Sequence, residues 1–417
     1  MADIFIVPGL RTPFVKAGTS YAAVSALELS APVAKAMTDR AHPDLLIWGQ
    51  VIPDPTVSNI ARELVFEADL DPEIPAFADV MACSTSFVGA IAAAGFLGHG
   101  DAHLALVGGV ETMSHRPIAL KQMKADQIAT LAMHDLPAAI NAIAAVTPAD
   151  FEIPANAWAN RISGRSMGEH TEDTAKLYGI TRAAQDALAL ASHQHAVQAR
   201  DETGFFSDLV LPGFGVEADT LPRAATSLDK LAALPTVFDR TATGTLTAGN
   251  SSPLTDGAAG VWVADAQGLE RLGRPAAVKL VDWQLAAMSY AVEGILMAPA
   301  RAIPRLLARH GLKAADIAVW ELHEAFAAQV LANIQAAMDP SYRREFAKID
   351  ADLGPFPYDR LNRHGGSLAL GHPFAATGAR ILSQAAKELL AEPIGAKAIV
   401  SVCADGGQGT VALLERV

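Results

Sequence analysis

The segment Ala76-Phe77-Ala78-Asp79-Val80-Met81-Ala82-Cys83-Ser84-Thr85-Ser86-Phe87-Val88-Gly89-Ala90 joins a strand-like run to a stretch of small residues. We expect Ala76–Met81 to form a strand and Ser84–Leu97 a closely packed helix. Cys83 then occupies a strand-to-helix turn, where helix N–H groups and the macrodipole stabilise a thiolate. The segment predicts an α/β protein with a nucleophilic thiol. The other interpretation is a small buried cysteine, as most free cysteines are.

Strand-like runs alternate with Ala-rich helical runs along most of the chain, which is typical of an α/β protein. We expect further strands at Ile4–Val7, Leu45–Trp48, His103–Val107, Gly260–Ala264, Ala277–Val281, Ile317–Leu322, Ala398–Val402 and Thr410–Leu414. We expect helices at Ala22–Thr38, Thr181–Arg200, Ala300–His310, Glu324–Met338 and Gly378–Leu390. The pair Gly108-Gly109 predicts a turn, and the last two strands flank a glycine turn that predicts a hairpin.

A change of composition after Pro117 predicts an inserted domain. From 118 to 243 the chain has helical pieces, isolated prolines and no clear series of strands. We therefore divide the chain into 1–117 plus 244–272, an inserted loop domain at 118–243, and a C-terminal half at 273–417. The two halves share a faint similarity, because Cys83 and His323 each follow a predicted strand and precede an Ala-rich helix. Chance could produce this similarity as readily as a true repeat.

Charge and cysteine content exclude several classes of protein. The 417 residues include 45 acidic and 32 basic side chains, for a net charge of −13. A general nucleic-acid binder is excluded, because neutralising phosphates needs clustered Lys and Arg. Two cysteines cannot form a disulfide framework, and no CxxC pair is present for zinc. With 51% hydrophobic residues, the chain is expected to be a reduced intracellular protein with a large core.

The sequence predicts no secretory signal and no membrane span. Asp3 stands where a signal peptide carries a positive charge, and Pro8 stops the first apolar run. Val80–Gly100 lacks formal charge and could span a bilayer, but its hydroxyl, glycine and histidine residues favour a buried helix. Leu136–Ala149 is either a packed helix or a surface that touches lipid or a partner. We expect a cytoplasmic protein.

Two further segments can carry chemistry. His372 follows the glycine-rich run Gly365–Gly371 and precedes Pro373, so it could take a proton from a thiol, although a turn histidine is the commoner outcome. Cys403 begins the run Cys403–Gly409, whose glycines allow backbone amides to face an oxyanion. A thiol there could act as an acid or base, and an incidental cysteine in a hairpin is the alternative.

Metal and dinucleotide sites are not expected. His323-Glu324-Ala325-Phe326-Ala327 lacks the second histidine of a zinc HExxH motif, because Ala327 occupies its place. Gly108-Gly109-Val110-Glu111 lacks the GxGxxG pattern of a dinucleotide-binding turn. We therefore predict neither a metal ion nor a tightly bound cofactor.

Taken together, the motifs resemble the thiolase family in order and spacing along nearly the whole chain. The matching segments are Arg11-Thr12-Pro13-Phe14, Cys83 with its helix, Gly108–Ser114, Met167-Gly168 with Glu172, Gly244–Ser252, His323–Ala327, Gly365–Pro373 and Cys403–Gly409. Most thiolases have Asn where this chain has His323. The variant looks like the thiolase (beta) subunit of fatty-acid β-oxidation multienzyme (trifunctional) complexes.

The resemblance implies a fold and a reaction. The fold would be five-layered, αβαβα, with two similar halves and a loop domain that covers the substrate. Cys83 would attack a 3-ketoacyl-CoA to give an acyl-enzyme and acetyl-CoA. His372 would accept the proton of Cys83 and later activate CoA, and Cys403 would be the acid or base for the acetyl-CoA carbanion. His323 would help to bind a thioester oxygen as it becomes an enolate.

The resemblance also implies binding residues and shows two departures. The backbone amides of Cys83 and Asp405 would form an oxyanion hole, although the family usually has a small residue at position 405. The Asp405 carboxylate must point away from the oxyanion, or activity is reduced. Lys230 stands where many relatives have Ser near CoA. Positions that match the CoA and acyl channel are Met167, Arg223, Ala248, Ser252, Ala325 and Phe326.

Three functions are therefore compared. The first is a 3-ketoacyl-CoA thiolase (acetyl-CoA C-acyltransferase) of fatty-acid β-oxidation, with coenzyme A as a substrate. The second is a biosynthetic acetoacetyl-CoA thiolase, which His323 and the long loop domain disfavour. The third is a thiolase-fold acyl-CoA binding protein without turnover. The resemblance also implies a homodimer or dimer of dimers, and a complex with an enoyl-CoA hydratase/3-hydroxyacyl-CoA dehydrogenase subunit.

Overall fold

The computed structural model describes residues 2–154 and 159–417. Within these residues, one ten-stranded sheet runs in the order β10-β11-β12-β9-β1-β8-β5-β3-β4, with β2 paired to β8. The strands are β1 Phe5–Val7, β2 Val15–Lys16, β3 Leu45–Gly49, β4 Ala76–Phe77, β5 Leu104–Thr112, β8 Thr255–Ala264, β9 Val278–Ala287, β10 Val319–Leu322, β11 Lys397–Ala404 and β12 Gln408–Arg416. The predicted C-terminal hairpin is present as the antiparallel pair β11 and β12.

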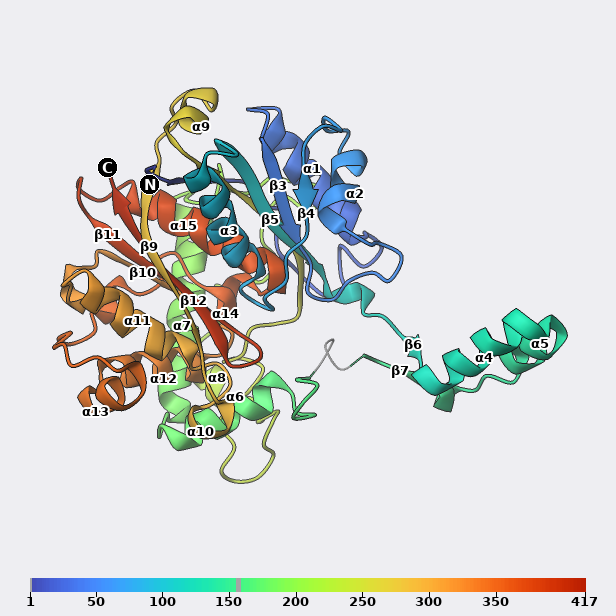
Figure 1. Cartoon of the computed structure of the whole chain (residues 1–417). Helices are drawn as coiled ribbons and strands as arrows, with labels where there is room; N and C mark the ends of the chain where they lie inside the picture. Colours follow the sequence, from blue (N-terminus) through green and yellow to red (C-terminus); the bar gives the residue numbers. More distant parts are fainter. Residues whose placement is uncertain (1, 155–158) are drawn as a thin grey trace.

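Helices cover and divide the sheet (Figure 1). They are α1 Ala26–Thr38, α2 Ile60–Glu67, α3 Thr85–His99, α4 Gln122–His134, α5 Leu136–Ala144, α6 Met167–Leu177, α7 Arg182–Val197, α8 Leu228–Ala232, α9 Ala266–Arg271, α10 Tyr290–Glu293, α11 Ala298–Arg309, α12 Ala327–Met338, α13 Pro340–Tyr342, α14 Ser367–Leu370 and α15 Thr377–Leu389. Side-chain caps define several starts. Thr181 caps α7 as predicted, and Ser25 forms a capping box with Glu28 at α1.

Three apolar clusters give the protein five layers. One cluster packs α1 and α2 against β3, β5 and β8. A second packs α3 and α15 against strands of both halves, from β1, β3, β5 and β8 to β9, β11 and β12. A third packs α11 and α12 on the far side of β10, β11 and β12. The order is helix, sheet, helix, sheet, helix, as expected. The two halves of the sheet are continuous, because β1 pairs with both β8 and β9.

The central helix α3 explains the long uncharged segment of the sequence. Ala82–His99 is long and apolar enough to cross a membrane by length and composition, yet 56% of it is buried inside the protein. Its small residues pack against α15 and the sheet, where Gly378 approaches the backbone of Phe87. Burial among other elements is therefore the reason for its low charge.

Two local predictions were wrong. The strand predicted at Ala76–Met81 ends at Phe77, because β4 pairs with β3 only through Ala76 and Phe77. The turn predicted at Gly108-Gly109 is absent, because β5 continues through both residues to Thr112. A Cβ on Gly108 would lie 2.1 Å from the ring of Trp48. The glycines serve close packing rather than chain reversal.

The interval 118–243 contains a projecting hairpin. Helices α4 and α5, with the short strands β6 (Ala119–Leu120) and β7 (Phe151–Glu152), extend away from the layered body (Figure 1). No residue of α4 is buried, and one residue of α5, Ala139, is buried. The exposed apolar side chains of this hairpin are Ile118, Met123, Met133, Leu136, Ile140, Ile143 and Phe151.

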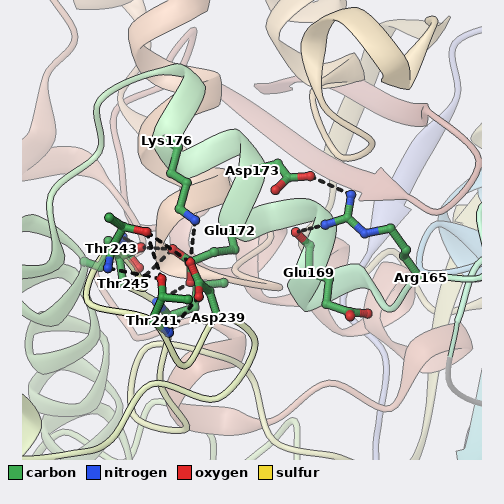
Figure 2. A network of polar contacts seen from close by, with 11 residues as sticks. Arg165, Glu169, Glu172, Asp173, Lys176, Asp239, Thr241, Thr243 and Thr245 are labelled. Atoms are coloured by element: carbon green, nitrogen blue, oxygen red, sulfur yellow. Dashed lines mark hydrogen bonds and ion pairs between the residues drawn. The ribbon is translucent and has the colours of Figure 1, made fainter.

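The remainder of the interval, from α6 to α8, is fastened to the body by polar contacts. Glu172 of α6 accepts hydrogen bonds from the backbone N–H groups of Thr245 and Leu246, at 2.8 and 2.9 Å. Figure 2 shows Glu172 and Thr245 in this network. One turn along α6, Lys176 pairs with Asp239 at 2.5 Å. The loop that contains Ala248 and Ser252 meets the C-terminal half elsewhere, where Ser251 pairs with Phe326 and the N–H of Ser252 donates to the carbonyl oxygen of Ala325.

Candidate active site

Cys83 lies in a tight turn between β4 and α3, as the sequence predicts. The preceding residue, Ala82, has a φ of 45°, a left-handed conformation that a residue with a side chain rarely adopts. The turn is tied to the other half of the molecule, because Ser84 donates a hydrogen bond to Thr410 of β12 at 2.7 Å. Cys83 is therefore positioned by segments from both halves of the fold.

His372 lies at the end of the glycine-rich segment, in a buried position. Its main chain pairs with Leu254, and its N–H donates to Oγ1 of Thr255 at 3.0 Å. Gly371 has a φ of 96°, and a Cβ there would lie 2.6 Å from Oγ1 of Thr255. Glycine is therefore required immediately before the histidine. A hydrogen bond of 2.7 Å joins Nδ1 of His372 to Oγ1 of Thr377.

His323 follows β10 and faces His372. Their ring centroids are 4.2 Å apart. The Cys83 sulfur and one nitrogen of each imidazole lie within 4.8 Å of one another. Nε2 of each histidine is buried and has no hydrogen-bond partner in the part of the chain that the structure describes. Both rings therefore have a nitrogen available to a substrate.

Cys403 lies near the end of β11 and is buried, whereas Cys83 is partly buried. The two cysteines are free, and burial, together with a charge on Cys83, raises the pKa of Cys403. Cys403 packs in an apolar cluster with Ala325, Phe326 and Met297, and Met167 lies against that cluster. The structure thus brings the four predicted groups of the reaction into one region.

Electrostatics keep these groups neutral. Burial raises the pKa of Cys83 to about 12, with contributions from the charges of Asp405 and Glu111, while N–H groups of Cys83 and Asp405 lower it. Burial therefore opposes the thiolate that the helix N-terminus is expected to stabilise, and that expectation stays a prediction. Burial and the charge of Arg380 lower the pKa of His372 to about 3. The resting pair is a thiol beside a neutral imidazole.

The Asp405 carboxylate points toward Asn160. Its Oδ1 accepts hydrogen bonds from Nδ2 of Asn160 at 2.8 Å and from the backbone N–H of Gly406 at 2.6 Å. The backbone N–H of Asp405 lowers the pKa of the Cys83 thiol. The side chain is thus held away from the predicted oxyanion hole, although its charge still acts on Cys83.

A cleft of about 470 Å³ lies beside the catalytic groups. It contains three of the six predicted binding residues, Arg223, Ala248 and Ser252. Leu254, which pairs with His372, also lines it. Lys16 and Arg116 add positive charge to its wall. Arg223 also lines a second cleft of about 530 Å³ with Lys230, whose Nζ donates to the carbonyl oxygen of Ala225 at 2.5 Å.

The remaining predicted binding residues adjoin Cys403. Ala325 and Phe326 are buried in the cluster that holds Cys403, and Phe238 connects this cluster to the cleft. The carbonyl oxygen of Ala325 accepts a hydrogen bond from the N–H of Ser252 at 3.0 Å. The predicted binding residues therefore form two connected groups, one polar and one apolar.

The same three side chains are also ligand types that bind zinc. Cys83, His323 and His372 offer one sulfur and two nitrogens at close range. A thiol with a neighbouring imidazole base needs the same grouping. The expectation that the protein uses no metal stays a prediction.

Comparison with known proteins identifies the family. A model described as the thiolase N-terminal domain matches residues 4–267, and one described as the thiolase C-terminal domain matches residues 274–416. The chain belongs to the thiolase family. A 3-ketoacyl-CoA thiolase of Erwinia tasmaniensis is 37% identical, over 99% of this chain and 96% of that protein. One of Pectobacterium carotovorum is 36% identical over the same shares.

Solved thiolase structures share the fold. The acetyl-CoA acetyltransferase of Bacillus anthracis superposes with a TM-score of 0.83 at 27% identity, covering 100% of this chain and 99% of that one. Human mitochondrial 3-ketoacyl-CoA thiolase gives 0.80 at 25% identity with the same coverage. A thiolase from Ascaris suum in complex with coenzyme A gives 0.79 at 25% identity, covering 100% of both chains.

Sequence reasoning missed several polar residues of this thiolase site. Glu324 accepts hydrogen bonds from Ser192, Asn362 and the N–H of Leu368. A Cβ on Gly366 would lie 2.3 Å from the Glu324 carboxyl carbon, so this glycine allows the carboxylate to hold the turn before His372. Other polar residues contact the histidines: Ser367 hydrogen-bonds to His323, Thr377 to His372, and Arg380 to Ser367. Their proximity to His372 in sequence was the available signal.

Proposed function

We propose that this thiolase is a 3-ketoacyl-CoA thiolase (acetyl-CoA C-acyltransferase), which cleaves 3-ketoacyl-CoA with CoA to acetyl-CoA and a shortened acyl-CoA. The observation that carries the proposal is the grouping of Cys83, His323 and His372 within 4.8 Å, with Cys403 in the adjoining cluster. A nucleophilic thiol, a base, an acid and a hydrogen-bond donor are the groups this reaction requires.

The first half-reaction forms the acyl-enzyme. The Cys83 sulfur bonds to the 3-keto carbon while its proton passes to Nε2 of His372. The bond between carbons 2 and 3 then breaks, and carbon 2 of the acetyl-CoA enolate takes the proton of Cys403. The imidazolium proton restores Cys403. Because burial and a Cys83 charge hold the pKa of Cys403 well above its usual range, Cys403 keeps its proton until the carbanion forms.

The second half-reaction releases the shortened chain. His372 takes the proton of a CoA thiol, and the CoA sulfur attacks the acyl carbon. The Cys83 sulfur leaves and recovers the proton from His372. The N–H groups of Cys83 and Asp405, which lower the pKa of the Cys83 thiol, would bind the oxygen of each tetrahedral intermediate. A covalent intermediate gives ping-pong kinetics.

The clefts support CoA as the second substrate. Lys16, Arg116 and Arg223 give the 470 Å³ cleft a positive wall, which suits the phosphates of CoA despite the net charge of −13. Ala248 and Ser252 then contact CoA, while Met167, Ala325 and Phe326 contact the acyl chain near Cys403. No tightly bound cofactor takes part in these steps.

Thiolysis assays test the function. The protein is incubated with CoA and 3-ketoacyl-CoAs of several chain lengths, and loss of the 3-keto species is followed. We expect turnover that Cys83→Ala abolishes. No turnover at any length, with wild type and Cys83→Ala alike, would mean an acyl-CoA binding protein. A steep preference for the four-carbon substrate would favour the biosynthetic alternative, which the similarity to the Bacillus anthracis acetyltransferase keeps open.

Self-association through β4 is part of the proposal. Among the described residues the sheet ends at β4, so its outer edge pairs with no further strand. Val80, three residues after β4, is 64% exposed. Phe96 is also exposed and its ring contacts Phe77 of β4, and Phe66 on α2 is exposed as well. We expect a homodimer or dimer of dimers in sedimentation experiments, and Val80→Asp to weaken it.

The projecting hairpin supports a second partner. Its exposed apolar residues, including Ile140 and Ile143, have no covering element in the described residues. We assign this surface to an enoyl-CoA hydratase/3-hydroxyacyl-CoA dehydrogenase subunit of a cytoplasmic β-oxidation complex. Co-purification with such a subunit should be lost in Ile140→Asp/Ile143→Asp. We also propose the domain division given above: an N-terminal half at 1–117 plus 244–272, a loop domain at 118–243, and a C-terminal half at 273–417.

A further inference from the structure

The geometry points to Ser367 and Arg380 as a positioning pair that fixes His323 in the tautomer with its proton on Nε2, facing the substrate oxygen. This inference rests on the proposed function. It concerns residues that touch His323 rather than the reacting atoms. Ser367, His323 and Arg380 are all at least 97% buried, so their hydrogen bonds have no competition from bulk water.

The direction of each hydrogen bond follows from the donor inventory. Nη2 of Arg380 lies 2.7 Å from Oγ of Ser367, and a guanidinium can only donate. Ser367 therefore uses a lone pair toward Arg380. Its hydroxyl proton then has one partner among the described residues, Nδ1 of His323 at 3.0 Å. Nδ1 must accept, and a neutral imidazole that accepts at Nδ1 carries its proton on Nε2.

The other tautomer would leave an unsatisfied group. If Nδ1 of His323 carried the proton, it would donate to Ser367. The Ser367 hydroxyl proton would then have no acceptor in the residues described, 2–154 and 159–417. Buried polar hydrogens without acceptors are disfavoured. Burial, His372 and Arg380 all lower the pKa of His323, so a doubly protonated ring is disfavoured as well.

The neighbouring histidine lacks such a pair. Nδ1 of His372 is bonded to Thr377, and Oγ1 of Thr377 has no other hydrogen-bond partner in the described parts of the chain. No second residue of the described chain directs the Thr377 hydroxyl, so Oγ1 can donate to Nδ1 or accept from it, and Nε2 of His372 can hold or lack a proton. Two adjacent imidazoles can therefore do opposite work, one donating and one accepting, because different residues stand behind them.

Buried contacts hold the positioning pair in place. Gln384 accepts from Nη1 of Arg380 at 3.4 Å and donates to Oε1 of Glu321 at 3.0 Å. Glu324 fixes Leu368, the residue after Ser367, through its N–H at 3.2 Å. The serine and the arginine thus come from α14 and α15, on either side of His372 in the sequence.

Nitrogen NMR of the protein labelled with ¹⁵N-histidine reads the tautomer directly. The His323 signals are those that disappear in His323→Asn. We expect an unprotonated Nδ1 and a protonated Nε2 in the unmodified protein. In Ser367→Asp, whose carboxylate can only accept, we expect the proton to move to Nδ1. A protonated Nδ1 in the unmodified protein would overturn the inference. This measurement is independent of turnover, so failure of the proposed function is distinguishable from failure of the tautomer assignment.

Kinetics separate positioning from simple structural support. Losing an oriented donor should lower kcat for thiolysis about 100-fold in Ser367→Asp and about 10-fold in Ser367→Ala, with KM for CoA within about twofold. Ser367→Thr keeps a hydroxyl and should restore most of the activity. The control is Ser383→Ala, which replaces a different buried serine, on α15, and should leave kcat unchanged.

A double-mutant cycle completes the test. An Asn side chain carries an N–H₂ donor whatever stands at position 367, so Ser367→Ala should cost less than about twofold when combined with His323→Asn. An equal cost of Ser367→Ala with and without His323→Asn would show a structural role and would overturn the proposal.

Discussion

Asn160 donates a hydrogen bond to Asp405 across 245 residues of sequence, with Nδ2 and Oδ1 2.8 Å apart. Asn160 is 6% exposed, and its own Oδ1 accepts from the N–H groups of Ile162 and Ser163. The Asn160 amide thus joins residues 160–163 to the turn that follows Cys403. The same hydrogen bond directs the Asp405 carboxylate away from the Cys83 sulfur, whose negatively charged form it would repel.

Replacing the Asp405 carboxylate by an amide should make Cys83 more reactive. In Asp405→Asn the Asn160 hydrogen bond can persist, whereas the negative charge that raises the pKa of Cys83 is removed. The pKa therefore falls, and the rate of alkylation by iodoacetamide at pH 9 should rise about threefold to tenfold. Cys83→Ser gives the background rate. An unchanged rate in Asp405→Asn, matching the remote control Asp101→Asn, would show that the charge does not reach the sulfur.

Adding one methyl group at Gly109 should damage both stability and catalysis. A Cβ there would lie 2.4 Å from the carbonyl oxygen of Ala375, three residues after His372. Backbone cannot yield as a flexible side chain does, so Gly109→Ala should cost about 1–3 kcal/mol and lower kcat. Gly95→Ala on α3 meets nothing within 4 Å and should be neutral or stabilising by up to about 1 kcal/mol. Thermal unfolding and thiolysis rates measure both, and equal effects would contradict the packing account.

Loss of the Glu172 carboxylate should loosen the loop beside the CoA cleft. In Glu172→Gln an N–H₂ group faces a backbone N–H of Thr245 or Leu246, so one buried donor loses its acceptor. We expect a loss of about 1–3 kcal/mol in unfolding free energy and a higher KM for CoA. Asp173→Asn on the same helix breaks an exposed pair with Arg165 and should cost less than about 1 kcal/mol. Similar losses in the two variants would argue against this role.

Asp79 should make stability fall as the pH rises. Burial raises its pKa from 3.8 to about 7, and its carboxyl oxygens have no partner in the described chain. The folded protein therefore keeps a proton that the unfolded chain releases, and stability is lost between about pH 4 and pH 7. Asp79→Asn does not titrate, so its advantage over wild type should grow by on the order of 2–3 kcal/mol from pH 4 to pH 8. Urea unfolding at fixed protein concentration measures this, and a constant difference would refute it.

The order of elements could be predicted because hydrophobic periodicity and glycine punctuation are local properties. The helix at α15 and the hairpin of β11 and β12 came out nearly complete for this reason. The Gly108-Gly109 prediction failed because glycine permits either a turn or a close approach, and Trp48 and Ala375 decide between them. Such distant partners are not visible in a local pattern.

The proximity of the candidate site residues could be predicted, but their protonation could not. The resemblance to thiolases implies that Cys83, His323, His372 and Cys403 share one site, and the structure brings them into one region. The pKa of Cys83 depends on burial by the whole fold and on Asp405, whose direction is set by Asn160. For Leu136–Ala149 the sequence left a packed helix and an exposed surface both open, and the structure shows α5 largely exposed, with Ala139 buried.

The three residues of β1 have a consequence for how the chain is made. Phe5 pairs with Ala264 of β8 and with Lys279 of β9, so the first strand synthesised waits for partners more than 250 residues later. The middle of the sheet cannot close on the ribosome until β9 has emerged. Long-range pairing of this kind slows folding and prolongs exposure of apolar surface. We therefore expect newly made chains to need chaperones until β9, which ends at Ala287, has been translated.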